Sequence, residues 1–95
     1  MKSDYYEKKT ARGILTLRLI GGHWELRLYT EPNPELYGKV IRSDYVDPDQ
    51  AALDASRGDF GISEFDDLFQ GVYVPSDLQK WRNFQSPFPY IQRDN

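Results

Sequence analysis

The chain has 95 residues, of which 39% are hydrophobic, 15% aromatic and 28% charged, and its net charge is −3. This length supports one domain with a thin core, residues 1–95, and this composition excludes wholesale disorder. The absence of cysteine excludes disulfides, thiolate nucleophiles and cysteine-based zinc sites, and it favours a reducing compartment. No segment has the apolar length of a signal peptide or a membrane span, so we expect a cytoplasmic protein.

The clearest local pattern predicts a β-hairpin. Residues 14–20 and 23–29 alternate apolar and polar side chains, and Gly21-Gly22 between them can adopt the positive φ angles of a two-residue turn. The register that this turn predicts pairs Ile20 with His23, Leu19 with Trp24, Leu17 with Leu26 and Leu15 with Leu28. One face is then entirely apolar, and the other face sets Arg18 opposite Glu25.

A third strand is expected over Lys39–Tyr45, after a loop at residues 31–38 that contains two prolines. Ile41 and Tyr45 fall on one face of this strand and Val40 on the other, so the pattern does not decide which face points toward the core. As an edge strand it could pair with a second copy, and we expect a monomer or a weak homodimer.

A helix with marked ends is predicted next. Asp47 is a good N-cap, Pro48 suits the first helical position and Gly58 supplies a C-terminal stop. The helix has few large apolar residues, so we expect it to pack on the sheet through its alanines.

The C-terminal half is harder to interpret from its pattern. Residues 59–74 predict a short helical turn, and residues 72–74 could add a short strand. A last helix is expected from Ser76, where Ser76-Asp77-Leu78-Gln79 matches a capping box.

Together these elements predict an α+β fold. We expect an antiparallel three- to four-stranded β-meander with two short helices packed on one face, the other face being wet. Residues 1–8 and 87–95 are expected to be flexible ends.

The charges are segregated along the chain. Residues 1–42 carry eight Lys/Arg and five Asp/Glu, residues 43–77 carry one and nine, and residues 78–95 carry three and one. The acidic segment either forms a patch that attracts a basic surface, or merely caps helix starts and solvates one face.

Calcium is the most concrete candidate for a metal ligand, because it takes six to eight oxygen ligands in irregular geometry. The candidate carboxylates are Asp44, Asp47, Asp49, Glu64 and Asp66. Their spacing does not match an EF-hand loop, and Asp47 is also a helix cap, so calcium binding is the alternative hypothesis and no other cofactor is expected.

Other site chemistries are weakly represented. His23 is the only histidine, which leaves a zinc site or a serine triad without partners, and no Gly-rich phosphate loop precedes a helix. Nucleic-acid binding is not expected, because the total charge is acidic and no RNA-binding motif is present. We therefore do not expect an enzyme.

Tyrosines bear most on partner binding, since they are enriched at interface cores and here exceed what a thin core needs. The sequence predicts a non-catalytic interaction module of the adaptor, regulator or inhibitor type, whose acidic surface binds a protein with a basic or mixed surface. The expected contact residues are Tyr37, Tyr45, Asp59, Glu64, Asp66, Asp67 and Tyr73, with the loop at 32–37 and the tail at 87–90 as preferred contact segments.

Overall fold

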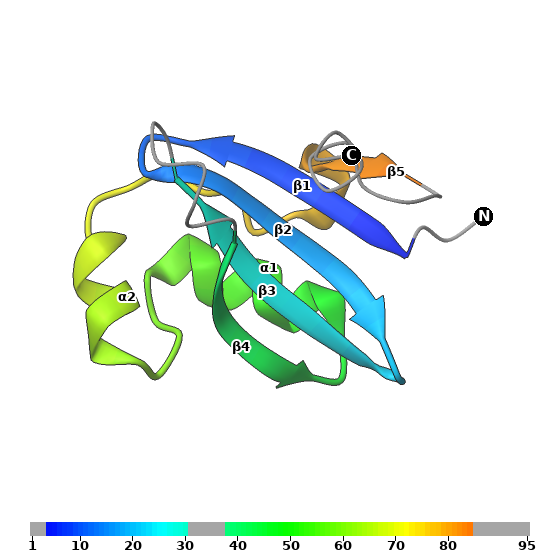
Figure 1. Ribbon diagram of the computed structural model, residues 1–95. Helices are drawn as coiled ribbons and strands as arrows, with labels where there is room; N and C mark the ends of the chain where they lie inside the picture. The colour runs from blue at the N-terminus through cyan, green and yellow to red at the C-terminus, as the bar shows by residue number, and fades with distance from the viewer. Residues whose placement is uncertain (1–3, 31–37, 85–95) are drawn as a thin grey trace.

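An antiparallel sheet forms the body of the fold in the computed structural model, which describes residues 4–30 and 38–84. Four strands make a meander: β1 (Tyr5–Thr10), β2 (Gly13–Ile20), β3 (His23–Tyr29) and β4 (Lys39–Tyr45). The short strand β5 (Arg82–Phe84) pairs with β1, so the spatial order is β4-β3-β2-β1-β5 (Figure 1). The helices of the described residues are α1 (Pro48–Arg57), α2 (Ser63–Leu68) and η2 (Leu78–Lys80), which is one turn of 3-10 helix. The predicted α+β class and antiparallel sheet are confirmed.

The β2–β3 hairpin has the predicted register at every pair, from Ile14 opposite Tyr29 to Ile20 opposite His23. Gly21 and Gly22 both have positive φ angles, as a two-residue type I′ turn requires. The leucines of the predicted apolar face are buried, with one exception: Leu19 is 46% exposed. It lies next to the turn, near the end of the strand, so the expectation of a wholly covered apolar face is wrong at this position.

Strand β1 corrects the expectation that residues 1–8 form a flexible end. Its residues Tyr5–Lys8 pair with β2, and Tyr5–Glu7 also pair with β5. Tyr5 is only 1% exposed. The local sequence is charged and aromatic rather than apolar, so its strand conformation depends on the two neighbouring strands that satisfy its backbone. Residues 87–95, the other expected flexible end, lie outside the described residues.

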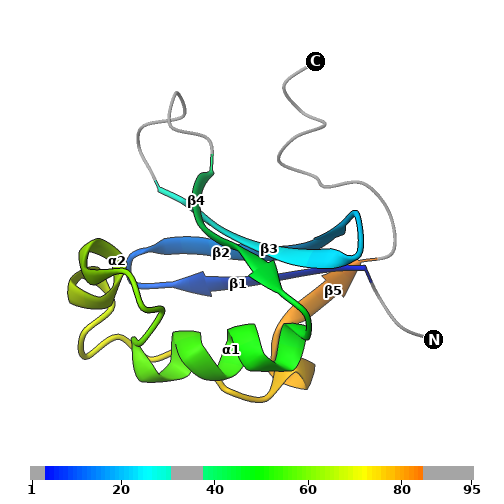
Figure 2. The ribbon, with the colours of Figure 1, turned by 90° about the horizontal axis from the view of Figure 1, so that it is seen from below.

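Helix α1 has the predicted ends. The Asp47 carboxylate accepts a hydrogen bond from the Asp49 N–H at 2.9 Å, Pro48 is the first helical residue, and Gly58 ends the helix in the left-handed conformation. The Gln50 side chain does not reach back to the cap and instead donates to Asp54. Figure 2 shows α1 lying beneath the sheet, and its three alanines, Ala51, Ala52 and Ala55, are fully buried in the same cluster as the sheet leucines, as expected.

Helix α2 lies beyond the end of the sheet at which β1 turns into β2 (Figures 1 and 2). The Arg12 Nε in that turn donates to the Leu68 carbonyl at 3.0 Å, and Phe65 reaches the core. The short helical turn expected between residues 59 and 74 is therefore present as α2. The packing of both helices on one face stays a prediction.

The segment from residue 72 to 84 differs from its predicted structure. Residues 72–74 form no strand. The helix expected from Ser76 is only η2, capped by Asp77 rather than Ser76. It ends after one turn because the chain then extends to pair with β1, and Trp81, whose Nε1 donates to the Pro75 carbonyl, is buried at this point.

In strand β4, Ile41 and Tyr45 are buried, whereas Val40 is exposed. The face with Ile41 and Tyr45 is therefore the one that points toward the core, which the sequence had left undecided. Its pairing with β3 is irregular between Trp24 and Arg27. Such irregularities protect an edge strand from pairing with another chain, and the weak homodimer through β4 stays a prediction.

The sheet face opposite the core is only partly solvated, which limits the expectation of a wet face to its margins. Glu7, Thr16 and Glu25 are buried there. Glu25 pairs with Arg18 at 3.3 Å, as predicted. It also pairs with Arg27, at 2.6 Å. Buried carboxylates need such partners, because an unpaired buried charge is strongly unfavourable.

Candidate functional site

Most carboxylates of the acidic segment are engaged in holding the fold. Asp66 accepts a hydrogen bond from the Phe60 N–H, and Glu64 pairs with Lys39 at 2.7 Å. Asp47 caps α1, and Asp77 caps η2. Asp59 and Asp67 are exposed. The acidic segment is therefore not one continuous docking patch, because several of its charges already have partners inside the molecule.

The expected tyrosine contacts are dispersed. Tyr45 is buried, and its hydroxyl donates to Asp54 at 2.9 Å, so its predicted role as a surface contact is corrected. Tyr73 is 75% exposed in the loop between α2 and η2. Tyr37 and the two preferred contact segments, at 32–37 and 87–90, lie outside the described residues.

The carboxylates proposed for calcium serve separate elements. Asp44 binds Arg42, Asp47 caps α1, and Glu64 and Asp66 belong to α2. Within residues 4–30 and 38–84, no three His, Cys, Asp or Glu side chains form a group that could hold a metal ion. The geometry of these residues thus offers no support for the calcium alternative.

An open groove of about 850 Å³ lies at the end of the sheet where β2 turns into β3. It lies between the start of β1, the tip of the hairpin, the entry to α1 and η2. Its lining residues are Asp4, Tyr6, Leu19, Trp24, Val46, Asp47, Pro48, Asp49, Leu78 and Gln79.

The inner surface of this groove is apolar. Trp24 and Leu78 are buried core residues that reach it from below, and the rings of Tyr6 and Trp24 contact each other with centroids 5.8 Å apart. Leu19 and Val46 stand at its rim, 46% and 79% exposed. An aromatic base with aliphatic side chains around it is the composition of a protein-contact surface, because aromatic rings bury the most area for each side chain ordered.

The charged groups of the groove are all acidic. Asp4, Asp47 and Asp49 are exposed, and no Lys or Arg belongs to the lining. The Asp47 carboxylate caps α1, and a carboxylate at a helix N-terminus is favoured by the helix dipole. The rim therefore favours cationic groups beside an apolar contact.

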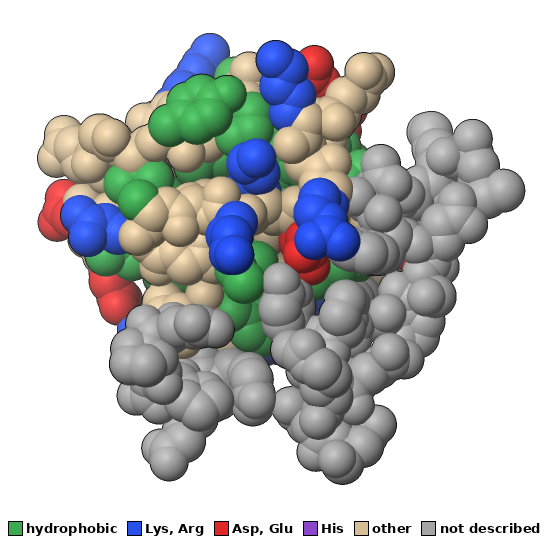
Figure 3. Space-filling model, turned by 90° about the horizontal axis from the view of Figure 1, so that it is seen from above, with side chains coloured by type: hydrophobic (Ala, Val, Ile, Leu, Met, Phe, Trp, Pro, Cys, Tyr) green, Lys and Arg blue, Asp and Glu red, His purple; other side chains and the backbone are tan. Residues whose placement is uncertain are grey.

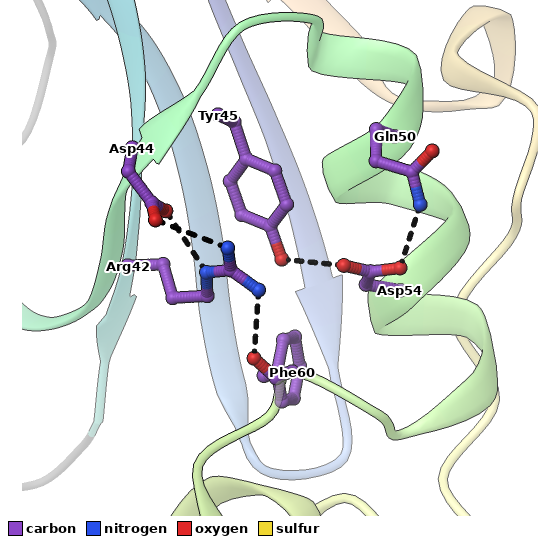
Figure 4. Close-up of polar contacts among 6 residues, drawn as sticks. All are labelled: Arg42, Asp44, Tyr45, Gln50, Asp54 and Phe60. Carbon is purple, nitrogen blue, oxygen red and sulfur yellow. Dashed lines mark hydrogen bonds and ion pairs between the residues drawn. The ribbon is translucent and has the colours of Figure 1, made fainter.

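A network of side chains holds the wall of the groove formed by residues 46–49 (Figure 4). Tyr45 hydrogen-bonds Asp54 of α1, while Arg42 makes two hydrogen bonds to Asp44 and one to the Phe60 carbonyl. These contacts join the end of β4 to α1 and to the loop after it. Val46, which directly follows, is thereby fixed with its side chain outside the core.

This network shifts the ionisation of its members. The hydrogen bonds from Arg42 hold the pKa of Asp44 below its ordinary value and raise the pKa of Arg42. Burial raises the pKa of Tyr45 well above its ordinary 10.0, and the hydrogen bond to Asp54 raises it further. At neutral pH the tyrosine is therefore a neutral donor, and Asp44 is a charged acceptor.

Comparison of the chain with protein-family models, with curated proteins and with solved structures found no match. None of the helices in the described part of the chain is long and apolar enough to cross a membrane.

The groove brings together residues that the sequence pattern did not single out, above all Tyr6, Leu19 and Val46. One signal for it was present. Leu19 and Ile20 are adjacent, so their side chains point to opposite faces of the sheet, and at least one of two large aliphatic residues must leave the core at the hairpin tip. The rest of the groove could not be predicted from the sequence. Leu19 and Val46 are 27 residues apart, and only the β4–α1 connection brings them to one groove.

Proposed function

We propose that this protein is a non-catalytic module that binds another protein through the groove at the hairpin end of the sheet. The partner presents apolar side chains beside Lys or Arg, that is, a basic or mixed surface. The lack of cysteine supports placing this activity in the cytoplasm.

The observation that carries the proposal is the exposure of Leu19 and Val46 in one groove that Tyr6 and Trp24 also line. Exposure of an aliphatic side chain to water is unfavourable. Burying a fully exposed Leu or Val side chain is worth about 1.5–3 kcal/mol. Single exposed apolar residues are ordinary, but several around one groove mark an interaction site.

The acidic rim supports a basic partner over an acidic one. Asp4, Asp47 and Asp49 surround the apolar surface, and like charges brought against them would be repelled. Carboxylates at a rim act mainly on the association rate and its salt dependence, whereas the apolar centre provides most of the affinity.

The test is affinity capture with the immobilised protein, followed by titration of each recovered partner. Leu19→Ser and Val46→Ser should each weaken binding at least tenfold, since each removes an apolar contact of the kind that dominates interface energies. Trp24 lies in the groove, so its fluorescence should change on binding of the wild-type protein.

Tyr73→Ser is the matched control, because it also replaces an exposed apolar side chain but lies outside the lining of the groove. Circular dichroism melts verify that each variant is folded. The proposal fails if partners bind Leu19→Ser and Val46→Ser as tightly as wild type, or if Tyr73→Ser loses binding to the same extent. Asp49→Asn should slow association at low salt and leave dissociation nearly unchanged.

A further inference from the structure

The cations of the described residues divide into two classes. Those on the sheet faces and on β4 are neutralised by carboxylates: Arg18 and Arg27 contact Glu25, Lys39 contacts Glu64, and Arg42 contacts Asp44. Lys8, Lys9, Arg12 and Lys80 have no carboxylate within ion-pair distance among the residues that the structure describes, and neither has Arg57 at the end of α1. Arg82 lies 3.9 Å from Glu7 and so belongs to the paired cations.

The first four of these cations lie along one edge of the molecule. Lys8 and Lys9 belong to β1, Arg12 to the turn after it, and Lys80 to η2 immediately before β5. Arg82 of β5 adds a fifth, 74% exposed, with the buried Glu7 at 3.9 Å. We name these five residues the basic edge, and Figure 3, which views the β1/β5 side of Figure 1, shows Lys and Arg side chains gathered on it.

The backbone of β1 is also open at this edge. The Leu19 N–H donates to the Asp4 carbonyl, so in an antiparallel ladder Tyr5, Glu7 and Lys9 direct their backbone groups away from β2. Tyr5 and Glu7 meet β5, but the pairing of β5 ends opposite Glu7. The N–H and C=O of Lys9 therefore face the edge beyond β5, where Glu7, Lys8, Lys9 and Arg82 line a hollow of about 190 Å³.

Screening separates this edge from the carboxylates beside β4, although Asp77, the cap of η2, lies next to Lys80. Strand β4, which carries Asp44, and β5 lie at opposite edges of the sheet, four strand spacings or about 19 Å apart. The Debye length at physiological salt is about 8 Å, so charges this far apart are largely screened from each other. A ligand at the basic edge thus responds to the local cations, and the net charge of −3, which underlies the expectation of no nucleic-acid binding, does not decide its binding.

We propose that the basic edge binds the phosphate backbone of a nucleic acid without sequence preference. Lys and Arg side chains, hydroxyl groups and backbone N–H groups make such contacts. The edge offers cationic side chains and the backbone N–H of Lys9, and Lys9 and Arg12 also line a second hollow of about 310 Å³. An acidic protein is the less suitable partner, because the core of a protein interface is apolar and the residues that line the first hollow, Glu7, Lys8, Lys9 and Arg82, are all charged.

Fluorescence anisotropy of a labelled single-stranded oligonucleotide of about 20 nucleotides tests the proposal. The wild-type protein should bind with a dissociation constant of about 10⁻⁶–10⁻⁴ M, and more tightly at about 50 mM than at about 200 mM salt. The double variant Lys8→Gln/Lys9→Gln should reduce the slope of log affinity against log salt by about 1.4, the value for two lost phosphate contacts to a single strand.

Lys9→Gln and Arg57→Gln form the matched pair, because each removes one cation that has no carboxylate partner among the described residues and only the first lies on the basic edge. Lys9→Gln should weaken binding and Arg57→Gln should not. Equal losses in both would show an effect of net charge and overturn the proposal, as would the absence of binding at about 50 mM salt. If polyglutamate at the same charge concentration displaced the oligonucleotide, the ligand of the basic edge would be an acidic protein and not a nucleic acid. The groove variant Leu19→Ser should bind the oligonucleotide like wild type, so this outcome is independent of the proposed protein-binding groove.

Discussion

At the scale of single residues, neighbouring carboxylates have different physical roles. Asp66 is half-buried and accepts the Phe60 N–H across six residues, whereas Asp67 next to it is exposed. An acceptor that satisfies a partly buried backbone N–H is costly to remove, because the donor is then left without a partner. The sequence of an acidic segment therefore does not show which carboxylates stabilise the fold and which are available to bind a partner.

Asp66→Ala should lower the free energy of unfolding by about 1–2 kcal/mol, the usual range for loss of a hydrogen bond to a charged acceptor that is partly exposed. Asp67→Ala should change it by less than about 0.5 kcal/mol, as for most surface substitutions. Urea denaturation followed by circular dichroism measures both. Equal stability of the two variants would contradict the assigned role of Asp66.

At the scale of elements, the Tyr45–Asp54 hydrogen bond links β4 to α1 across the connection that carries Val46. The tyrosine is buried, and its hydroxyl contacts a carboxylate that also binds Gln50 of the same helix. Ionisation of Tyr45 would place a second negative charge beside Asp54 in this environment. The folded protein thus raises the pKa of Tyr45 above 10.0, and stability depends on pH accordingly.

The sign follows from linkage. Because the pKa of Tyr45 is higher in the folded than in the unfolded state, the stability it contributes is complete below about pH 10 and decreases as the pH rises above that value. Tyr45→Phe should cost about 1–2 kcal/mol at pH 8 through the lost hydrogen bond. It should also lose less stability than wild type between pH 8 and about pH 10.5. Urea denaturation at both pH values tests this, with Tyr73→Phe, exposed and outside the network, as the variant expected to behave like wild type.

At the scale of the whole molecule, the sheet separates two surfaces of opposite character. The groove at the hairpin end is apolar with an acidic rim, and the basic edge runs along β1 and β5. Both surfaces depend on β1, since Asp4 and Tyr6 line the groove while Lys8 and Lys9 lie on the basic edge. The N-terminal strand is therefore essential to both proposed interactions as well as to the fold.

Removal of residues 1–8 should leave the protein unfolded or nearly so at 25 °C. Burial of Tyr5 alone is worth about 1.5–3 kcal/mol, a large part of the roughly 5–15 kcal/mol by which a domain is stable, and β2 and β5 would also lose the strand with which they pair. Removal of residues 1–3 takes away no part of β1 and is the control. Thermal melts followed by circular dichroism compare the two truncated chains. A cooperative melt with the wild-type midpoint for the chain that lacks residues 1–8 would show that β1 is dispensable.

Local chemistry in the sequence determined the hairpin and α1. Two glycines allow only a few turn geometries, alternation then sets the register of residues 14–29, and Asp47, Pro48 and Gly58 mark the ends of one helix. These signals depend on residues within a few positions of one another. For that reason they could be interpreted without knowledge of the rest of the chain.

Tertiary structure alone decided the ends of the sheet and the candidate site. The polar segment 5–10 became a strand because β2 and β5 satisfy its backbone, and the helix expected from Ser76 stopped after η2 because the chain turns to pair with β1. The groove joins side chains from five separate segments of the chain. No local pattern encodes such a surface, since its residues come from several strands and helices, and their proximity follows from how these elements pack together.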